Sequence, residues 1–444
     1  MKNISIKTRI LFLVFLFCSE NIVAQPTQKI SLNGAIELTL ANNLQIKQAA
    51  YIAGISDENL KQARYEHLPS LESAVSSTRQ YGLFFDQQTG QLLNSTLDQL
   101  NGRLTASIPI FQGFSIINQV KQNKNFWLAS KSNIEKIRND LSLEVISIYL
   151  QILANKDLIT ASQQQLELSK NQLNIVQKRF EVGNNTKADL AQAKAQLSTN
   201  KLNVTQAQNA YDQAILNLKQ LMEMDTEKSI EVVAPLVDEI LFTVNHKCKD
   251  IFDKAIEISP DIKSAQYNTT AFKYGVNVAK GRLYPTFSFG GGITTGYTSN
   301  SPFLFNEQLT DKNLGKSLGF NLTVPLSTNY RIRSVYNISK IKYENAKNIE
   351  QLAKNNLNKV INQAVLNLRS AEKRYFATKS ALDSSTEVFN VSRKRFEVGL
   401  LNSIELNLAQ TNFNKAQFDW IQAKYDLLFR NKVIDFFLGN ALTF

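Results

Sequence analysis

Two stretches of the chain, residues 187–222 and 403–438, carry large apolar side chains at every seventh position. The first has Leu190, Leu197, Val204, Tyr211 and Leu218, and the second has Leu406, Phe413, Trp420, Leu427 and Ile434. Alanine often stands three positions after each of them, which allows neighbouring helices to approach closely. A heptad pattern of this kind is typical of long helices packed as a coiled coil. Packing explains these side chains fully, and we assign them no chemistry.

Helix-breaking residues are nearly absent from the segments around these stretches. Within residues 114–234, Gly183 is the only glycine and there is no proline. Within residues 326–438, Gly399 is the only glycine and there is again no proline. Such segments predict two long α-hairpins, each interrupted by one turn. The predicted helices cover residues 119–181 and 187–222 in the first hairpin and 335–397 and 403–438 in the second, with tips at residues 182–186 and 398–402.

The two hairpins belong to an internal repeat with an offset of 216 residues. The hexapeptide Lys-Arg-Phe-Glu-Val-Gly at residues 178–183 recurs at residues 394–399. The register extends upstream, where Pro69, Tyr81 and Pro109 correspond to Pro285, Tyr297 and Pro325. The sequence therefore predicts a first structural repeat over residues 25–228 and a second over residues 251–444. Residues 229–250 form the linker between them, and residues 231–235 within it are predicted to form a short strand.

Each repeat also contains a helix followed by a pair of predicted strands. The helices cover residues 33–66 and 249–282, and the strands lie at about residues 69–82 and 102–112 and at about residues 285–298 and 317–328. In the second pair, Phe287, Phe289, Leu318 and Phe320 alternate with small or polar residues. One apolar face and one polar face, with aromatic residues near both ends, suit a wall between lipid and water. Because the smallest membrane barrels need about eight strands, four per chain predict a barrel shared between subunits.

The hairpin tips combine the pattern of a helix end with that of a helix start. Gly183 and Gly399 suit the left-handed backbone that ends a helix. The segments Thr186-x-x-Asp189 and Asn402-x-x-Glu405 match the capping box that begins a helix, or a near variant of it. Helix capping alone is therefore enough to explain both carboxylates.

Net charge and the N-terminal segment bear on location. The formal net charge is +12, and the basic residues are spread along the predicted helices, which indicates solvated helix surfaces rather than a nucleic-acid site. Residues 1–24 have a basic start and a short apolar run, and they predict a secretory signal peptide that contains Cys18. Phe17 is too large to precede a lipid-attachment cysteine, so we expect Cys18 to be removed with the signal peptide. Cys248 is then the one remaining cysteine and has no disulfide partner within the chain. No later segment approaches the ~20 apolar residues of a membrane-spanning helix.

The tandem repeat, the proline-bounded strand pairs and the repeated tip motif together resemble the TolC-type outer-membrane efflux channels. The tip motif Val-Gly-x-x-(Ser/Thr/Asn)-x-x-(Asp/Glu) stands at residues 182–189 and 398–405. The resemblance implies a mainly α fold with a small β part, in which the hairpins form a periplasmic coiled-coil barrel and the strands join a transmembrane β-barrel of twelve strands shared by a trimer. It also implies a bacterial outer membrane location, with the helical part in the periplasm.

The same resemblance implies a passive exit duct for small molecules, and it also implies the partners of that duct. They are a homotrimer, outer-membrane lipid, a periplasmic membrane-fusion adaptor and an inner-membrane pump of the RND, ABC or a similar type, with no nucleic acid and no cofactor. The adaptor contacts would lie at the tips, at Val182, Gly183, Asn184, Thr186, Val398, Gly399, Leu400 and Asn402. The pore constriction would involve Asp189, Phe396, Leu401, Glu405 and Leu408.

The sequence departs from the family pattern at this constriction. Well-known members tie the closed tip with a tyrosine and an arginine of the second hairpin to an aspartate of the first. The aspartate is present as Asp189, but the tyrosine position is Phe396 and the arginine position is Leu401. The second of two acidic positions is Leu408. We therefore expect the closed state to depend on packing of Phe396, Leu401 and Leu408.

Two further functions remain open from the sequence. The chain could serve a type I protein secretion system, or it could be a periplasmic coiled-coil scaffold without a pore. An enzyme is not indicated, because no nucleophile–base pair or phosphate-binding loop has supporting context. His67, His246 and Cys248 are too few and too far apart for a metal site. With only Met222 and Met224 after the signal peptide, a methionine-lined copper path is not expected either.

Overall fold

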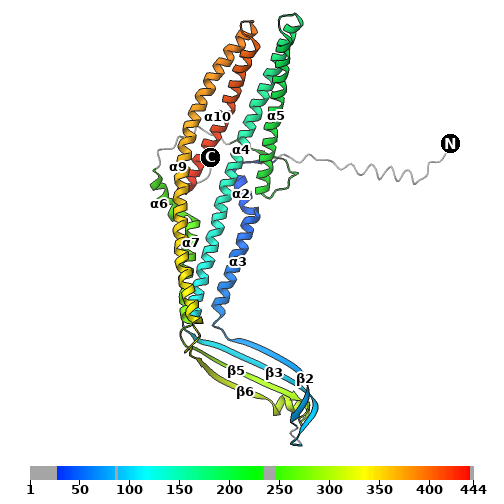
Figure 1. Ribbon diagram of the computed structural model, residues 1–444, viewed down its shortest axis with the longest axis vertical. Helices are drawn as coiled ribbons and strands as arrows, with labels where there is room; N and C mark the ends of the chain where they lie inside the picture. The colour runs from blue at the N-terminus through cyan, green and yellow to red at the C-terminus, as the bar shows by residue number, and fades with distance from the viewer. Residues whose placement is uncertain (1–27, 86–88, 235–246, 441–444) are drawn as a thin grey trace, which may run out of the picture. The chain divides into compact units, whose positions relative to one another are not determined.

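The computed structural model describes residues 28–85, 89–234 and 247–440. The predicted signal peptide, Cys18 and His246 lie outside these residues. The first repeat contains the helices α2 (Leu32–Asn42), α3 (Leu44–Tyr65), α4 (Ser115–Glu181) and α5 (Lys187–Leu221). The second contains α6 (Cys248–Ile258), α7 (Pro260–Gly281), α9 (Arg331–Glu397) and α10 (Ser403–Leu438). Figure 1 shows α4 with α5 as one hairpin and α9 with α10 as the other.

The prediction of one unbroken helix before each strand pair is wrong. In the first repeat the helix is broken at Asn43, whose backbone leaves the helical region at φ −57° and ψ 131°. The Asn43 side-chain amide donates to the carbonyl of Leu221, 3.0 Å away, which holds the break against the end of α5. In the second repeat the break falls at Ser259, because Pro260 follows it and disfavours helical backbone at the preceding residue.

The four long strands form one antiparallel sheet in the order β2-β3-β5-β6. Their bounds are Ser70–Phe85, Leu92–Gln112, Thr286–Thr298 and Gly315–Thr323. The first hairpin is longer than predicted, since pairing continues outward to Phe85 and Leu92. The last strand is shorter than predicted, and it ends before Pro325, which has no N–H to donate to a sheet. The short helices α8 (Phe305–Glu307) and η1 (Gln308–Lys312) fill the loop between β5 and β6.

The described residues divide into two compact units that do not follow the sequence repeats. Of the described residues, the first unit comprises 28–44, 138–234, 247–251 and 361–440, so it holds both hairpin tips. The second comprises residues 45–137 and 252–360, and it holds the sheet. The helices α4 and α9 each run through both units.

The core of the first unit is organised around Tyr149 on α4. The short strand β4 (Ile230–Val232), which the sequence predicts, pairs in parallel with β1 (Gln28–Ile30), a strand of only three residues that the sequence does not predict. The fully buried Tyr149 hydroxyl donates to the carbonyls of Ile30 and Val233 and so ties this ribbon to the helices. Burial raises the pKa of Tyr149 to about 12, so the hydroxyl keeps its proton at physiological pH.

None of the helices in the described part of the chain combines the length and the apolar composition that crossing a membrane requires.

Candidate functional site

The two hairpin tips have the backbone geometry that the sequence predicts. Gly183 and Gly399 adopt φ values of +78° and +83°, in the left-handed region that favours glycine. At the start of α5, the Thr186 hydroxyl accepts from the amide of Asp189, and the Asp189 carboxylate accepts from the amide of Thr186. At the start of α10, the Asn402 side chain accepts from the amide of Glu405 at 2.9 Å. The Asp189 carboxylate therefore completes a capping box, whereas the Glu405 carboxylate accepts only from the Asn402 side-chain amide, at 3.1 Å.

A pair of contacts, here called the tip clasp, joins the two hairpins of the chain. The Arg179 guanidinium of α4 donates to the carbonyls of Phe396 and Glu397, at 3.0 and 2.7 Å, where α9 ends. It also lies 5.0 Å from the centre of the Phe396 ring. In the second contact, the Ser403 hydroxyl of α10 donates to the Asp189 carboxylate of α5. The clasp thus links both helices of one hairpin to both helices of the other.

The electrostatics of the clasp favour its formation at neutral pH. The last carbonyls of a helix have no partner within the helix and carry partial negative charge, so a guanidinium is a suitable donor for them. Hydrogen bonds from Ser403, and then from Thr186, hold the pKa of the Asp189 carboxyl below its ordinary value. Because the folded pKa is depressed, this stabilising contribution is present above about pH 4 and is lost as the pH falls through the folded pKa.

An apolar cluster lies directly behind the tips. It contains the buried side chains Val176, Ala193, Phe389, Phe396, Leu406 and Ala409, with Leu401 packed against them. The rings of Phe389 and Phe413 stack with centres 5.2 Å apart. Phe396 and Leu401 thus pack within one chain. Leu408 lies outside this cluster and is 62% exposed, so any packing partner for it must come from another molecule.

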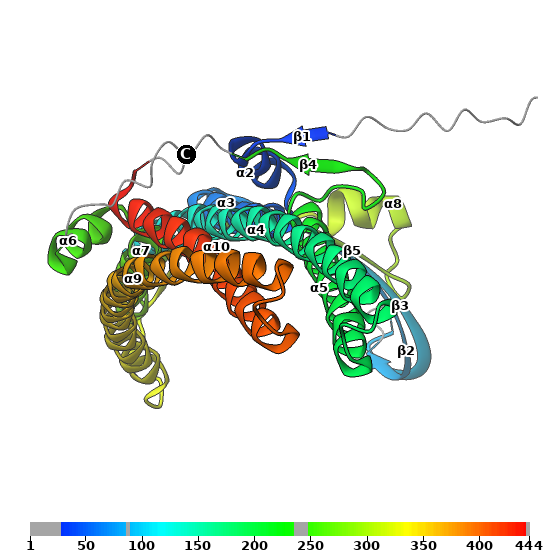
Figure 2. The same ribbon diagram turned by 90° about the horizontal axis from the view of Figure 1, so that it is seen from above.

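Beyond the apolar cluster, α4 and α10 also meet through amide side chains that are buried or half-buried. In Figures 1 and 2 these two helices lie beside each other. Gln165 donates to Gln417 at 3.1 Å, and Gln172 donates to Asn407 at 3.2 Å. We define the polar seam as Gln165 and Gln172 of α4 with Asn407, Gln410, Asn414 and Gln417 of α10. The α10 members are spaced by three and four residues, as core positions of a coiled coil are.

Several atoms of the polar seam are buried without a hydrogen-bond partner among the described residues. They are the Gln165 Oε1, the Gln410 Nε2 and the Asn414 Oδ1, and the nearby Trp420 Nε1 shares this property. A buried polar group without a partner costs about 1–3 kcal/mol. The seam therefore fixes which helices meet, as buried polar core positions do, but it adds less stability than an apolar seam would.

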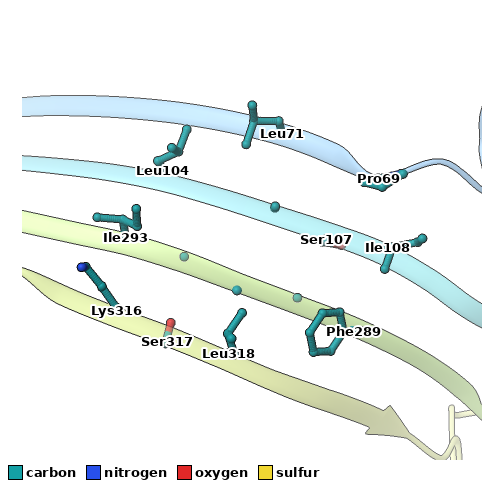
Figure 3. Close-up of a pocket in the computed structure, with 14 residues that line it drawn as sticks. Pro69, Leu71, Leu104, Ser107, Ile108, Phe289, Ile293, Lys316, Ser317 and Leu318 are labelled. Atoms are coloured by element: carbon teal, nitrogen blue, oxygen red, sulfur yellow. The ribbon is translucent and has the colours of Figure 1, made fainter.

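The sheet of the second unit has one apolar face. Cross-strand register places Leu71, Leu104, Ile293 and Leu318 on the same face, around a shallow depression floored by Ala106 and Gly291 (Figure 3). Leu318, Phe320 and Leu322 on the edge strand β6 are largely exposed. The opposite face carries mainly small and polar residues, and the apolar face is interrupted by Lys316 and by the ion pair of Arg79 with Asp98. This distribution matches the predicted wall between lipid and water.

Comparison with known proteins agrees with these features. The model of the outer membrane efflux protein family matches residues 35–222 and 251–440, so the chain belongs to this family. Outer membrane efflux protein BepC of Brucella suis is 20% identical over 404 residues, which cover 90% of this chain and 83% of that protein. Alkaline protease secretion protein AprF of Pseudomonas aeruginosa is 22% identical over 353 residues, covering 77% and 70% respectively.

Solved structures show the same fold at low sequence identity. The Campylobacter jejuni CmeC outer membrane channel superposes with a TM-score of 0.78 at 19% identity, covering 92% of this chain and 85% of that one. The outer-membrane channel OprN also gives 0.78, at 17% identity, covering 93% and 90%. The predicted family, fold class and outer membrane location, with the helical part in the periplasm, are confirmed. The family and its structural neighbours are channel proteins rather than enzymes.

The sequence predicts site roles for Asp189 and Phe396, whereas Arg179 and Ser403 become apparent only from their contacts in the structure. Arg179 belongs to the repeated hexapeptide, so the repeat itself carried a signal for it. Ser403 had no such signal, because its counterpart in the first repeat is Lys187. The polar seam is likewise not apparent from the heptad pattern, because that pattern is defined by large apolar residues.

Replacing Gly399 by valine tests the backbone geometry of the tip. A β-branched residue at a φ of +83° is strained, and we expect a local cost of about 1–3 kcal/mol. Hydrogen exchange of the amides at residues 398–402 should speed up while the sheet stays protected. Leu400→Val is the matched control, because it introduces the same side chain beside Gly399 on backbone that is not left-handed. Equal exchange in the two variants would contradict the assignment.

Proposed function

We propose that the chain forms the outer-membrane exit duct of a tripartite export system, as a homotrimer. The observation that carries the proposal is the four-stranded sheet, which has one apolar face and whose edge strands β2 and β6 pair with no further strand among the described residues. The backbone N–H and C=O groups of an open edge can pair with further strands. Closing the sheet into a barrel pairs these groups and removes both edges. Three copies would supply twelve strands, within the range known for membrane barrels.

The hairpin tips are the proposed docking surface for a periplasmic adaptor, which links the duct to an inner-membrane pump. Val182, Val398 and Leu400 are exposed at the tips, and their apolar side chains lie next to the Gly183 and Gly399 turns. Exposed apolar residues at the end of a long hairpin suit a contact with another protein. Cysteines introduced at Asn184 or Leu400 should crosslink to the adaptor in cells.

The exported cargo is proposed to be small molecules, with protein secretion as the second candidate. The relative BepC carries the name of an efflux protein, whereas AprF is named for protease secretion. Both are similar to this chain to a comparable degree, so the choice depends on the pump. A periplasmic scaffold without a pore is disfavoured by the apolar sheet face.

Assembly is the direct test of the proposed duct. Native mass measurement of the full-length protein in mild detergent should give three chains per particle. The protein should also require detergent to leave the outer membrane. A stable monomer that stays in solution without detergent would contradict the proposal.

A second prediction concerns charge at the pore entrance. Glu405 is exposed at the tip of the second hairpin, and threefold symmetry would bring three such carboxylates around one axis. A carboxylate ring attracts cations, so we expect a cation-preferring channel that multivalent cations block from the periplasmic side. Glu405→Gln should weaken both properties because it removes the charge and keeps the shape.

Glu167→Gln is the matched control for this measurement. Glu167 is an exposed carboxylate on α4 that pairs with Lys170, well before the tip in sequence. Bilayer conductance should show unchanged cation preference in this control. If Glu405→Gln behaved like the control, Glu405 would be only a helix cap.

A further inference from the structure

The internal repeat supplies a second set of the groups that form the tip clasp. The first repeat contributes Arg179, which donates in the clasp, and Asp189, which accepts. Their counterparts in the second repeat are Arg395 and Glu405. On the opposite side of the clasp, Phe396, Glu397 and Ser403 correspond to Phe180, Glu181 and Lys187 of the first repeat. Each chain therefore contains one assembled clasp and the two separated halves of another.

The separated halves are exposed where the assembled ones are covered. Phe396 is 3% exposed in the clasp, but its counterpart Phe180 is 38% exposed. Ser403 is buried, whereas Lys187 is exposed, and Arg179 is half-buried, whereas Arg395 is exposed. The side chains of Arg395 and Lys187 make no hydrogen bond or ion pair with other residues in the described part of the chain. The unused halves are thus open surfaces at the tip.

We propose that these halves meet between neighbouring copies of the chain and rebuild the tip clasp there. The inference rests on the trimer proposed above. A ring closed by a single rotation places the second repeat of one chain against the first repeat of the next. Arg395 of one protomer then donates to the Phe180 and Glu181 carbonyls of the next protomer, and Glu405 pairs with Lys187 of that protomer.

The chemistry of the exposed residues suits this contact. The carbonyls of Phe180 and Glu181 end α4, as those of Phe396 and Glu397 end α9, so they offer an arginine the same partners. The exposed Phe180 ring provides a face for the guanidinium, as Phe396 does for Arg179 at 5.0 Å. Where the in-chain clasp joins a serine hydroxyl to a carboxylate, the contact between chains joins an ammonium to a carboxylate.

This arrangement makes the tip a ring of six clasps of two kinds. Three lie within chains and are formed by Arg179 with Ser403 and Asp189. The other three lie between chains and hold the protomers together at the end of the helical part. The Lys187 charges also lower the net negative charge of the Glu405 ring, so Lys187→Gln should raise the cation preference that Glu405→Gln lowers.

Disulfide trapping tests the inference and distinguishes the two kinds of clasp. In a Cys248→Ser background, Lys187→Cys with Glu405→Cys should give covalently linked dimers and trimers on oxidation. The matched pair, Asp189→Cys with Ser403→Cys, should form its disulfide within one chain and migrate as a monomer on a denaturing gel. The two side chains of this second pair are in contact within the chain, so we expect their cysteine replacements to face each other.

The possible outcomes distinguish an error in the proposed contact between chains from an error in the proposed trimer. If native mass measurement shows trimers but the Lys187→Cys/Glu405→Cys protein migrates as a monomer after oxidation, the interface is wrong and the duct proposal stands. If native mass measurement shows no trimer, both are overturned. As an independent test, Lys187→Glu should lower the temperature at which the trimer dissociates in detergent, and Lys187→Glu with Glu405→Lys should restore it. No restoration would also overturn the pairing.

Discussion

We expect Gln417→Leu alone to destabilise the packing of the two hairpins, whereas Gln165→Leu and Gln417→Leu together should leave it as stable as before or more stable. In the native chain Gln165 donates to Gln417 at 3.1 Å within the polar seam. The single substitution leaves the whole Gln165 amide buried without a partner, at a cost of about 1–3 kcal/mol. The double substitution removes both amides and adds apolar contact between α4 and α10, so the cost disappears. Thermal unfolding of the purified protein measures the difference.

Gln363→Leu is the control for this pair of variants. Gln363 lies on an exposed part of α9, and its side chain donates to Asn367 in the next turn of the same helix. Its replacement should therefore change the free energy of unfolding by no more than about 0.5 kcal/mol. The contradicting outcome is additivity, in which the double variant loses the sum of the two single losses.

Arg179→Ala is expected to loosen the closed tip. It removes two hydrogen bonds from a charged donor, at 3.0 and 2.7 Å, each of a kind worth about 1.5–3 kcal/mol. Hydrogen exchange at the end of α9 should speed up by about tenfold or more, and reconstituted channels should conduct more in the resting state. Arg179→Lys should rescue only in part, since an ammonium cannot contact two carbonyls and a ring in the same way.

Lys178→Ala is the matched control for this variant. Lys178 is the adjacent basic residue of the same hexapeptide, and its side chain is exposed. The net charge changes equally in the two proteins, so a difference between them reports the clasp rather than the charge. Equal conductance in both would show that Arg179 does not hold the tip closed.

The sequence predicted the parts of this fold that depend on local chemistry. Proline and glycine spacing located the long helices, and the φ values of Gly183 and Gly399 follow from their positions at the hairpin tips. The helix breaks were harder, because Asn43 interrupts an otherwise regular helical pattern through a contact with Leu221, which lies far away in the sequence. The strand β1 was missed for a similar reason, since it exists only through its pairing with β4.

The candidate site shows the same division between local and long-range contacts. The capping roles of Asp189 and Glu405 could be predicted because both partners lie within three residues. The partners of Arg179 and Ser403 lie in the other repeat, and no spacing rule reveals them. The polar seam could not be predicted, because glutamine in a long amphipathic helix is ordinarily a surface residue. Only the burial of Gln165 and its hydrogen bond to Gln417 of α10 show that these amides lie between the helices.

Single-channel recording of the full-length protein in a planar bilayer tests the central claim, that the chain forms an export duct, most directly. The account predicts discrete conductance steps with a preference for cations, and larger steps for Arg179→Ala than for Lys178→Ala. Particles that native mass measurement shows to be trimers, yet that give no conductance in either the native protein or Arg179→Ala, would contradict it.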